Sequence, residues 1–312
     1  MGTRVILVVI FAAAAALLVQ RGAFNRERLG SGDGGGPRIV QDVQRDAIPP
    51  LDNPKYETAS EAENWLGPDD PVLGVEFNGD ARAYPLKVMN WHEIVNETIG
   101  GEDVVVTYCP LCRSGIVFDR SFEGQLLSFG NTGALYESAM VMYDRETETY
   151  WYQAGALGIK GPHEGKKLTI LPSRMTLWRE WKADNPGTKV LSIDTGFGRN
   201  YLSDPYTGHD RPDSSPAFPV SRIDDRLPNK ILIVGIVVDG KAKAYPVREL
   251  RGQTVTDEFN GQKIEVVGDE SGQGAQILFV DEQGGRTPAP VTAEFWFSWA
   301  VSHPDTEIYK SD

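Results

Sequence analysis

Residues 74–86 read GVEFNGDARAYPL, and residues 235–247 read GIVVDGKAKAYPV, so one segment of the chain returns 161 positions later. In each segment, two runs of strand-forming residues flank a turn, Asn78-Gly79 in the first and Asp239-Gly240 in the second. Asn-Gly and Asp-Gly favour the two-residue turn of a β-hairpin. The repeat therefore predicts the same hairpin at two places in the chain.

The repeat extends well beyond this hairpin. HEIVNE at 92–97 matches QTVTDE at 253–258, and a second hairpin is expected to turn at 100–101 and at 260–261. Both copies end with a tryptophan and a Pro-x-Thr sequence, and these begin at Trp181 and Trp299, only 118 positions apart. We therefore expect about forty extra residues in the first copy, between Asp119 and Trp178.

Turn residues recur along the folded part between short alternating segments, which is typical of strands. The sequence thus predicts a β-rich α+β fold, in which two internally duplicated lobes contain short antiparallel strands, hairpins and a few short helices. Helices are expected at 57–65, 86–91 and 176–183. Residues 48–191 would form the first lobe, 192–232 a connecting segment and 233–312 the second lobe.

The amino-terminal region has a different composition. Residues 5–19 are all apolar, which is short for a spanning helix of about 20 residues, so 1–28 is interpreted as a signal peptide or membrane anchor. The Gly-rich stretch that follows, 29–47, is expected to be a flexible linker. These segments predict an extracytoplasmic protein, secreted or anchored, that meets a membrane only through its amino-terminal segment.

The charge of the chain excludes one class of partner. It has 44 acidic and 31 basic residues, for a formal net charge of -13. A protein that binds nucleic acid needs a surplus of Lys and Arg to face the phosphates. We therefore expect no nucleic-acid partner.

The chemistry is expected at the Cys109-Pro110-Leu111-Cys112 turn, which follows the predicted strand 104–108. Proline at the second position favours a tight turn that brings two sulfur atoms within bonding reach. The chain has no other cysteine, so a four-thiolate metal site within one chain is excluded.

The second copy has no counterpart of this chemistry. In place of His92, Cys109 and Cys112 it has Gln253, about Asp269 and about Gly272. The scaffold therefore does not need those three side chains.

A soft-metal site is the first interpretation of the turn. His92 precedes the hairpin whose second strand ends at Cys109, and Met140 and Met142 would share one face of a strand. Two thiolates, an imidazole and the Met142 thioether favour a copper ion over zinc or magnesium. In this hypothesis Cys109, Cys112, His92 and Met142 bind copper and pass it to a protein partner.

Two alternatives remain open. Cys109 and Cys112 would be the catalytic pair of a thiol-disulfide oxidoreductase that transfers electrons to a protein partner, with Arg113 favouring a thiolate. Residues 115–119 are predicted to form a strand, whereas thioredoxin-like proteins have a helix after this motif. The other alternative is a non-catalytic binding module in which the cysteine pair only braces the turn.

Longer motifs resemble one family. NWHEIVN at 90–96, TYCPLC at 107–112 and VMYDRETE at 141–148 resemble the domain-of-unknown-function family numbered 3179, found in exported prokaryotic proteins. The resemblance covers roughly 72–306 and implies no particular activity. The family pattern usually has glycine after the second cysteine, where this chain has Arg113.

Overall fold

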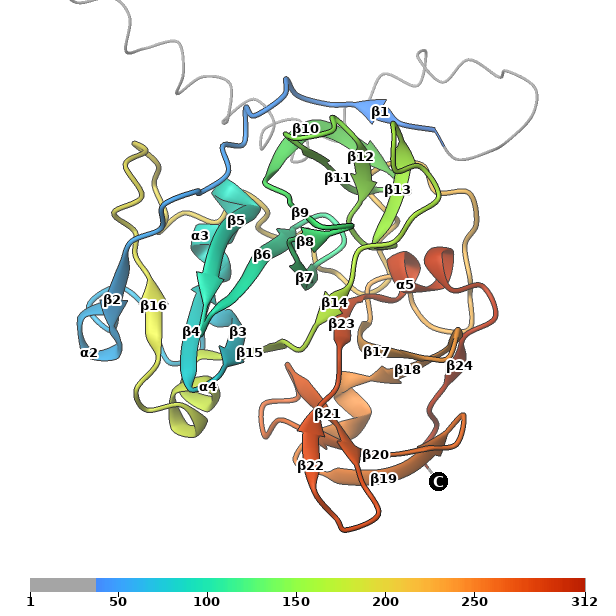
Figure 1. Ribbon diagram of the computed structural model, residues 1–312. Coiled ribbons are helices and arrows are strands. Elements are labelled where there is room, and N and C mark those ends of the chain that lie inside the picture. The colour runs from blue at the N-terminus through green and yellow to red at the C-terminus, as the bar shows by residue number, and fades with distance from the viewer. Residues whose placement is uncertain (1–37, 312) are drawn as a thin grey trace, which may run out of the picture.

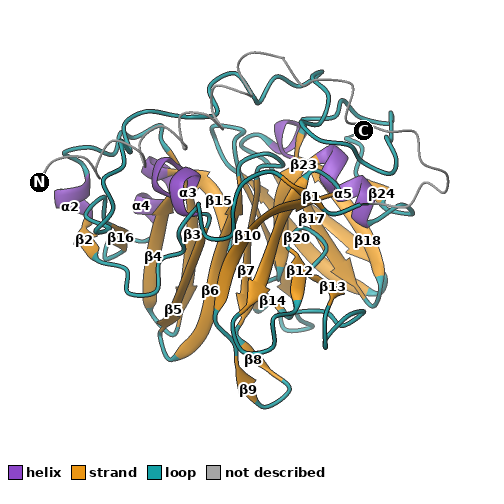
Figure 2. Cartoon of the chain, turned by 90° about the horizontal axis from the view of Figure 1, so that it is seen from above, coloured by secondary structure: helices purple, strands orange, loops and turns teal. Residues whose placement is uncertain are grey.

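The structure is a computed structural model that describes residues 38–311. The predicted signal peptide or anchor, and the predicted linker as far as residue 37, lie outside the described residues. Within 38–311, no helix is long and apolar enough to cross a membrane. Strands dominate the fold, and Figure 2 shows the short helices gathered along one edge of the molecule.

The two copies contain matching elements in the same order. One strand of the second copy, β22 (Arg286–Pro288), has its counterpart in β14 (Ile170–Leu171), which stands at the end of the extra residues of the first copy. The first copy consists of β3 (Pro71–Phe77), β4 (Asp80–Pro85), α3 (Leu86–His92), β5 (Ile94–Ile99), β6 (Glu102–Cys109), β7 (Ser114–Asp119), β15 (Arg174–Leu177), α4 (Trp178–Asp184) and β16 (Lys189–Leu191). The second consists of β17 (Leu232–Val238), β18 (Lys241–Pro246), the 3-10 helix η2 (Val247–Leu250), β19 (Thr254–Phe259), β20 (Gln262–Gly268), β21 (Ala275–Val280), β22 (Arg286–Pro288), β23 (Val291–Phe295), α5 (Trp296–Ser302) and β24 (Glu307–Ile308). The duplicated, β-rich α+β fold is thus confirmed.

Strand pairing repeats between the copies. β3 lies between β15 and β4, and β16 joins β4 in parallel; likewise β17 lies between β23 and β18, and β24 joins β18 in parallel. The parallel pairs have the same register, because Lys189 faces Arg82 in one copy and Glu307 faces Lys243 in the other. Both closing segments thus return to the hairpin that opens their copy.

One glycine in each copy explains this return. A Cβ atom on Gly74 would lie 2.2 Å from the ring of Trp181, and one on Gly235 would lie 2.4 Å from the ring of Trp299. Each tryptophan therefore packs flat on a strand at a position that only glycine allows. Each indole N–H also donates to a threonine hydroxyl seven residues on, at 2.9 and 2.8 Å.

Strands of both copies join in one sheet, with the order β24-β18-β17-β23-β7-β6-β5. The junction is the antiparallel contact between β23 and β7, where Ala293 pairs with Gly115. Figure 1 shows β23 beside β14 (Ile170–Leu171), a further strand that pairs with β7. The end of β6 and the start of β7 consequently lie beside the second copy.

The extra residues of the first copy form a sheet of their own. They contain β8 (Ser121–Phe122), β9 (Gln125–Leu126), β10 (Phe129–Tyr136), β11 (Ala139–Asp144), β12 (Tyr150–Tyr152), β13 (Leu157–Lys160) and β14. β10 to β13 make a five-stranded sheet with β1 (Val40–Gln41), whose edge position was not expected inside a flexible linker. This sheet covers the Cys109–Cys112 turn, because both cysteines share a core cluster with Met140 and Met142 of β11.

The predicted helices occur, with one shorter than expected. α3 and α4 lie where 86–91 and 176–183 predicted them. The segment 57–65 instead begins with β2 (Tyr56–Thr58), and its helix α2 (Ala59–Ala62) starts at a capping box between Thr58 and Glu61. The connecting segment from 192 to 231 contains neither helix nor strand.

Candidate functional site

The Cys-Pro-Leu-Cys turn joins β6 to β7 at the junction of the two copies. Cys109 is the last residue of β6 and pairs with Ser114, the first residue of β7. Both cysteines are free thiols, with exposed fractions of 1% and 0% for Cys109 and Cys112. Arg113 has a φ of 51°, in the left-handed region that favours glycine, which accounts for the glycine usual there in the family pattern.

A chain of hydrogen bonds fixes the proton on Cys112. The Thr107 hydroxyl donates to the Ile116 carbonyl at 2.7 Å, so it must accept from the amide N–H of Gln153 at 3.0 Å. The amide oxygen of Gln153 then accepts from the Ser114 hydroxyl at 2.6 Å. Since that hydroxyl has given up its only proton, its oxygen accepts from the Cys112 thiol, 3.0 Å away.

The two thiols consequently differ in acidity. Burial raises the pKa of Cys112 well above its usual value, and the neighbouring Cys109 raises it further. Burial also opposes ionisation of Cys109, but hydrogen bonds from the backbone of Cys112, Met140 and Leu111 lower its pKa below the usual value. The turn therefore holds one thiol that ionises readily beside one that keeps its proton.

Two buried acids flank the thiols. Glu93 follows α3, and its carboxylate accepts from the Asn131 amide at 2.7 Å. Burial raises its pKa well above the usual value, and the charge of Cys109 adds to this. Glu294, on β23 of the second copy, is fully buried, and burial raises its pKa to about 8. Glu294 thus holds a proton near neutral pH, and the buried Glu93 resists ionisation more than an exposed glutamate does.

His92 lies away from the predicted ligand set. Its Nδ1 is 2.8 Å from the Pro49 carbonyl, which can only accept, so Nδ1 donates there. Nε2 then accepts from the Tyr201 hydroxyl at 2.6 Å. Burial lowers the pKa of His92 to about 4, which keeps the ring neutral. Because neither nitrogen has a free lone pair, the structure does not support His92 as a metal ligand.

The rest of the predicted ligand set is assembled only in part. Met142 and Met140 are buried in the cluster that contains Cys109 and Cys112, as a shared strand face predicts. Within residues 38–311, however, no three His, Cys, Asp or Glu side chains form a group that could hold a metal ion. Any metal at the turn would therefore depend on the sulfur atoms.

The second copy has a turn of the same length, 269–274. Asp269 takes the place of Cys109, because its backbone N–H bonds to the Gly274 carbonyl as Cys109 pairs with Ser114. Gly272 takes the place of Cys112, as the sequence suggested. The sequence match of His92 with Gln253 was wrong. The Tyr108 N–H donates to the Glu93 carbonyl in the first copy, and the Gly268 N–H donates to the Gln253 carbonyl in the second, so Gln253 corresponds to Glu93. The shorter η2 moves the match by one residue.

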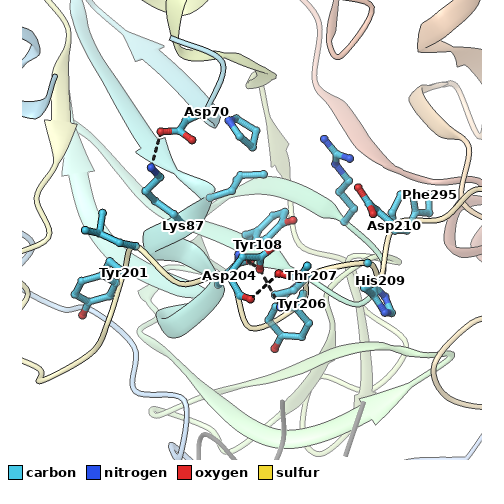
Figure 3. Close-up of a pocket in the computed structure, with 17 residues that line it drawn as sticks. Asp70, Lys87, Tyr108, Tyr201, Asp204, Tyr206, Thr207, His209, Asp210 and Phe295 are labelled. Atoms are coloured by element: carbon cyan, nitrogen blue, oxygen red, sulfur yellow. Dashed lines mark hydrogen bonds and ion pairs between the residues drawn. The ribbon is translucent and has the colours of Figure 1, made fainter. Parts of the chain in front are cut away.

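A cavity of about 390 Å³ adjoins the turn (Figure 3). Tyr108, Pro110 and Arg113 line one wall, and Tyr206 and His209 of the connecting segment line another. Figure 3 shows Tyr108, Asp204 and Tyr206 close together in the middle, with the Asp70–Lys87 pair to one side. The His209 ring donates to the Leu111 carbonyl at 2.9 Å, so the connecting segment is fastened to the turn itself.

Sequence reasoning found the cysteines but missed the polar groups around them. Ser114 and Gln153 carry no motif of their own, and Glu93 lies within NWHEIVN, where only His92 was considered a candidate. Glu294 had a detectable signal, because the 118-residue spacing of the closing segments matches it with Thr176 of the first copy. An acid that replaces a hydroxyl in the other copy is the kind of difference that marks a site.

The comparisons place the chain in a family. The family model described as "Protein of unknown function (DUF3179)" matches residues 45–306, most of the chain. No curated protein and no solved structure matches it. The match includes the Cys109–Cys112 turn, the inserted sheet and both copies of the repeat. This chain belongs to the DUF3179 family.

Proposed function

We propose that this protein exchanges thiols and disulfides, with Cys109 as the attacking thiol and Cys112 as the resolving thiol. The observation that carries the proposal is a pair of free thiols in one turn beside a cavity, with the Cys112 thiol hydrogen-bonded to Ser114. A lowered pKa gives Cys109 the thiolate that attacks a disulfide, while Cys112 keeps its proton until it is needed. The strand after Cys112 distinguishes this arrangement from the thioredoxin-like helix.

The reaction balances with a disulfide as the second reactant. The Cys109 thiolate attacks one sulfur of the partner disulfide, forms a mixed disulfide and releases the first partner thiolate, which takes a proton from solvent. Cys112 then loses its proton and attacks the Cys109 sulfur, which releases the second partner thiol. The Cys109–Cys112 pair is oxidised by two electrons and the partner disulfide is reduced by two.

We assign the approach of the partner to the cavity beside the turn. It is bounded by Tyr108 and Pro110, the neighbours of Cys109. The sulfur atoms are buried, so the connecting segment must move aside, and the hydrogen bond from His209 to Leu111 is the contact that must open. A protein disulfide in an extracytoplasmic compartment fits the predicted export segment.

Trapping tests the proposal. The full chain with Cys112→Ser, treated with oxidised glutathione, should keep one glutathione per chain on Cys109, because the resolving thiol is gone. Cys109→Ser is the matched control and should trap at least tenfold less, since the thiol of Cys112 stays protonated. Intact mass measures both. Equal labelling of the two variants, or none in either, would overturn the assignment.

A soft-metal site is the second candidate, because Met140 and Met142 are 1% and 0% exposed in the same cluster as the two thiols. Two thiolates with one or two thioethers suit copper(I), which a protein partner would supply or receive. Titration of the reduced chain with copper(I) should then give one ion per chain, lost in Cys109→Ser and kept in His92→Ala. No binding by the reduced wild type would remove this candidate.

A purely structural pair is the remaining outcome. If the cysteines only brace the turn, the double variant Cys109→Ser with Cys112→Ser keeps its fold, and the wild type neither exchanges disulfides nor binds copper(I).

A further inference from the structure

The dithiol lies against one strand of the second copy. Ala293 of β23 pairs with Gly115, and the Phe295 N–H donates to the Cys112 carbonyl at 2.9 Å. Glu294 is the residue between these two contacts. Its position beside the turn is thus fixed by the backbone on both sides.

The surroundings of Glu294 leave its carboxyl group incompletely bonded. The Thr292 hydroxyl donates to Oε1 at 3.1 Å, but Oε2 has no hydrogen-bond partner. The hydroxyl of Ser298 in α5 interacts with this carboxyl group and lowers its pKa, but it makes no hydrogen bond of normal geometry. Buried polar atoms are nearly always bonded, because an unpaired one costs several kcal/mol, so such atoms point to a use other than stability.

The duplicated turn shows that the fold does not require this gap. Glu294 and Ser298 correspond to Thr176 and Glu180 of the first copy, which face Asp269 in the place of Cys109. There the Thr176 hydroxyl donates to Asp269 at 2.5 Å, and Glu180 accepts from the N–H of Ser271 at 3.0 Å. The same positions are fully bonded where the turn has no thiols.

We propose that Glu294 of the second copy is the proton acceptor for Cys112, so that the two copies together build one redox site. This inference rests on the proposed disulfide exchange. In the resolving step the Cys112 thiol gives its proton to the Glu294 carboxylate, and the resulting thiolate attacks the Cys109 sulfur of the mixed disulfide. The departing partner thiolate takes the proton from Glu294, which returns the carboxylate.

Few other titratable groups face this step. Cys109 lies in the turn, Tyr152 of β12 interacts with both Cys112 and Glu294, and Glu93 interacts with Cys109. Tyr108 of β6 interacts with both thiols, and burial raises its pKa, so it stays neutral. Burial raises the pKa of Tyr152 well above its usual value, so it stays neutral. The Glu93 carboxylate accepts a hydrogen bond from the Asn131 amide, and Glu93 interacts with Cys109 rather than with Cys112. Glu294 is therefore the acid that we assign as the acceptor of the Cys112 proton, because its charge acts on Cys112.

The experiment separates the two steps of exchange in the full chain. Oxidised glutathione loads Cys109, and rapid acid quench followed by mass analysis gives the rate at which Cys112 releases the glutathione between about pH 6 and pH 10. The wild-type rate should rise with an inflection near pH 8, the pKa of Glu294. Glu294→Gln should lose that inflection and resolve about 10²-fold more slowly at neutral pH, the usual contribution of a positioned base.

Three further variants make the result specific. Glu294→Asp keeps an acid and should restore part of the rate and the pH dependence. Glu93→Gln, the matched loss of the other buried acid, should keep the wild-type inflection. The rate of the first step, measured in Cys112→Ser with and without Glu294→Gln, separates an effect on loading from an effect on resolution.

Two results would overturn the inference. One is a Glu294→Gln chain with the wild-type rate and pH profile; the other is an inflection removed by Glu93→Gln and kept by Glu294→Gln. Both leave disulfide exchange intact, so they differ from a wild type that forms no mixed disulfide, which would overturn the proposed function instead.

Discussion

The turns at 109–114 and 269–274 occupy the same place in the two copies, but their buried polar side chains have different partners. In the second copy, the buried Asp269 pairs with Arg174 and Thr176 of the first copy. In the first, Cys109 and Cys112 face Glu294 of the second copy, whose Oε2 has no partner. Each turn is thus completed by the closing strand of the other copy. The Asp269 carboxylate has a charged partner there, whereas the Glu294 carboxyl group has none.

The difference teaches what each turn contributes. A buried ion pair with its hydrogen bonds in place holds the copies together, and breaking it is costly. An incompletely bonded acid beside two thiols costs stability instead, and proteins retain such groups where they have a chemical role. The duplicated scaffold therefore serves as an internal reference for the site.

The largest effect is expected from the charge of Glu294. Its pKa is about 8 in the folded protein against an ordinary 4.5, so the folded state holds a proton that the unfolded state releases. Its contribution to stability is complete below about pH 4.5 and is lost as the pH rises through 8. The loss is roughly 5 kcal/mol.

Urea unfolding of wild type and Glu294→Gln between pH 5 and pH 9 measures this effect. The wild type should lose stability relative to the variant as the pH rises. A constant difference between the two would show that Glu294 is ionised throughout and would remove the contrast between the turns.

The second effect is on the bonded turn. Asp269→Ala leaves the Arg174 guanidinium, whose side chain is 14% exposed, without its buried partner. The free energy of unfolding should fall by about 3 kcal/mol, the lower end of the usual cost of breaking a buried ion pair, because Asp184 still pairs with Arg174. The matched control is Asp184→Ala, which removes the exposed partner of the same arginine and should cost less than about 1 kcal/mol. Equal losses in the two variants would contradict the account.

A third, smaller effect tests the equivalence of the copies. Gly74→Ala and Gly235→Ala each place a methyl group against a tryptophan ring that cannot move away. Both should lower the free energy of unfolding by about 1–3 kcal/mol, as overpacking does, and by similar amounts. A control at Gly187, where no atom lies within 4 Å of a Cβ, should be close to neutral.

The smallest effect concerns access to the thiols. His209→Ala removes the hydrogen bond to the Leu111 carbonyl, worth about 1 kcal/mol, so Cys109 should react with iodoacetamide about fivefold faster. Ser214→Ala removes a similar bond within the connecting segment that does not reach the turn, and it should leave the rate unchanged. Faster labelling in both variants would indicate general loosening instead.

The duplication and the β-rich class were predictable because turn residues and buried aromatic residues recur at matching positions in the two copies. Gly74 and Gly235, with their tryptophans, are readable as a pattern, and the same residues fix the strand order. Two features were not readable. The shared sheet depends on the single contact between β7 and β23, which has no local signature, and β1 lies in a stretch whose composition favours a linker.

The site was predictable only in its sulfur atoms. Cys109 and Cys112 stand close in sequence, so their proximity follows from the turn. His92 was matched with Gln253 because the helix in the second copy is shorter, which shifted the match by one residue and hid the correspondence of Glu93 with Gln253. Glu294 lies far from the turn in sequence, and only the pairing of β23 in the second copy with β7 in the first places it beside the turn.

The reduction potential of the Cys109–Cys112 pair tests the central claim most directly. The full chain is equilibrated with graded ratios of reduced and oxidised dithiothreitol, quenched in acid, and the disulfide fraction is measured by mass. The account predicts one two-electron transition with a midpoint above about -300 mV, in the range of exchangeable disulfides. A midpoint below about -300 mV would contradict the account, because such a disulfide is too stable to exchange. So would two thiols that form no disulfide under oxidising conditions.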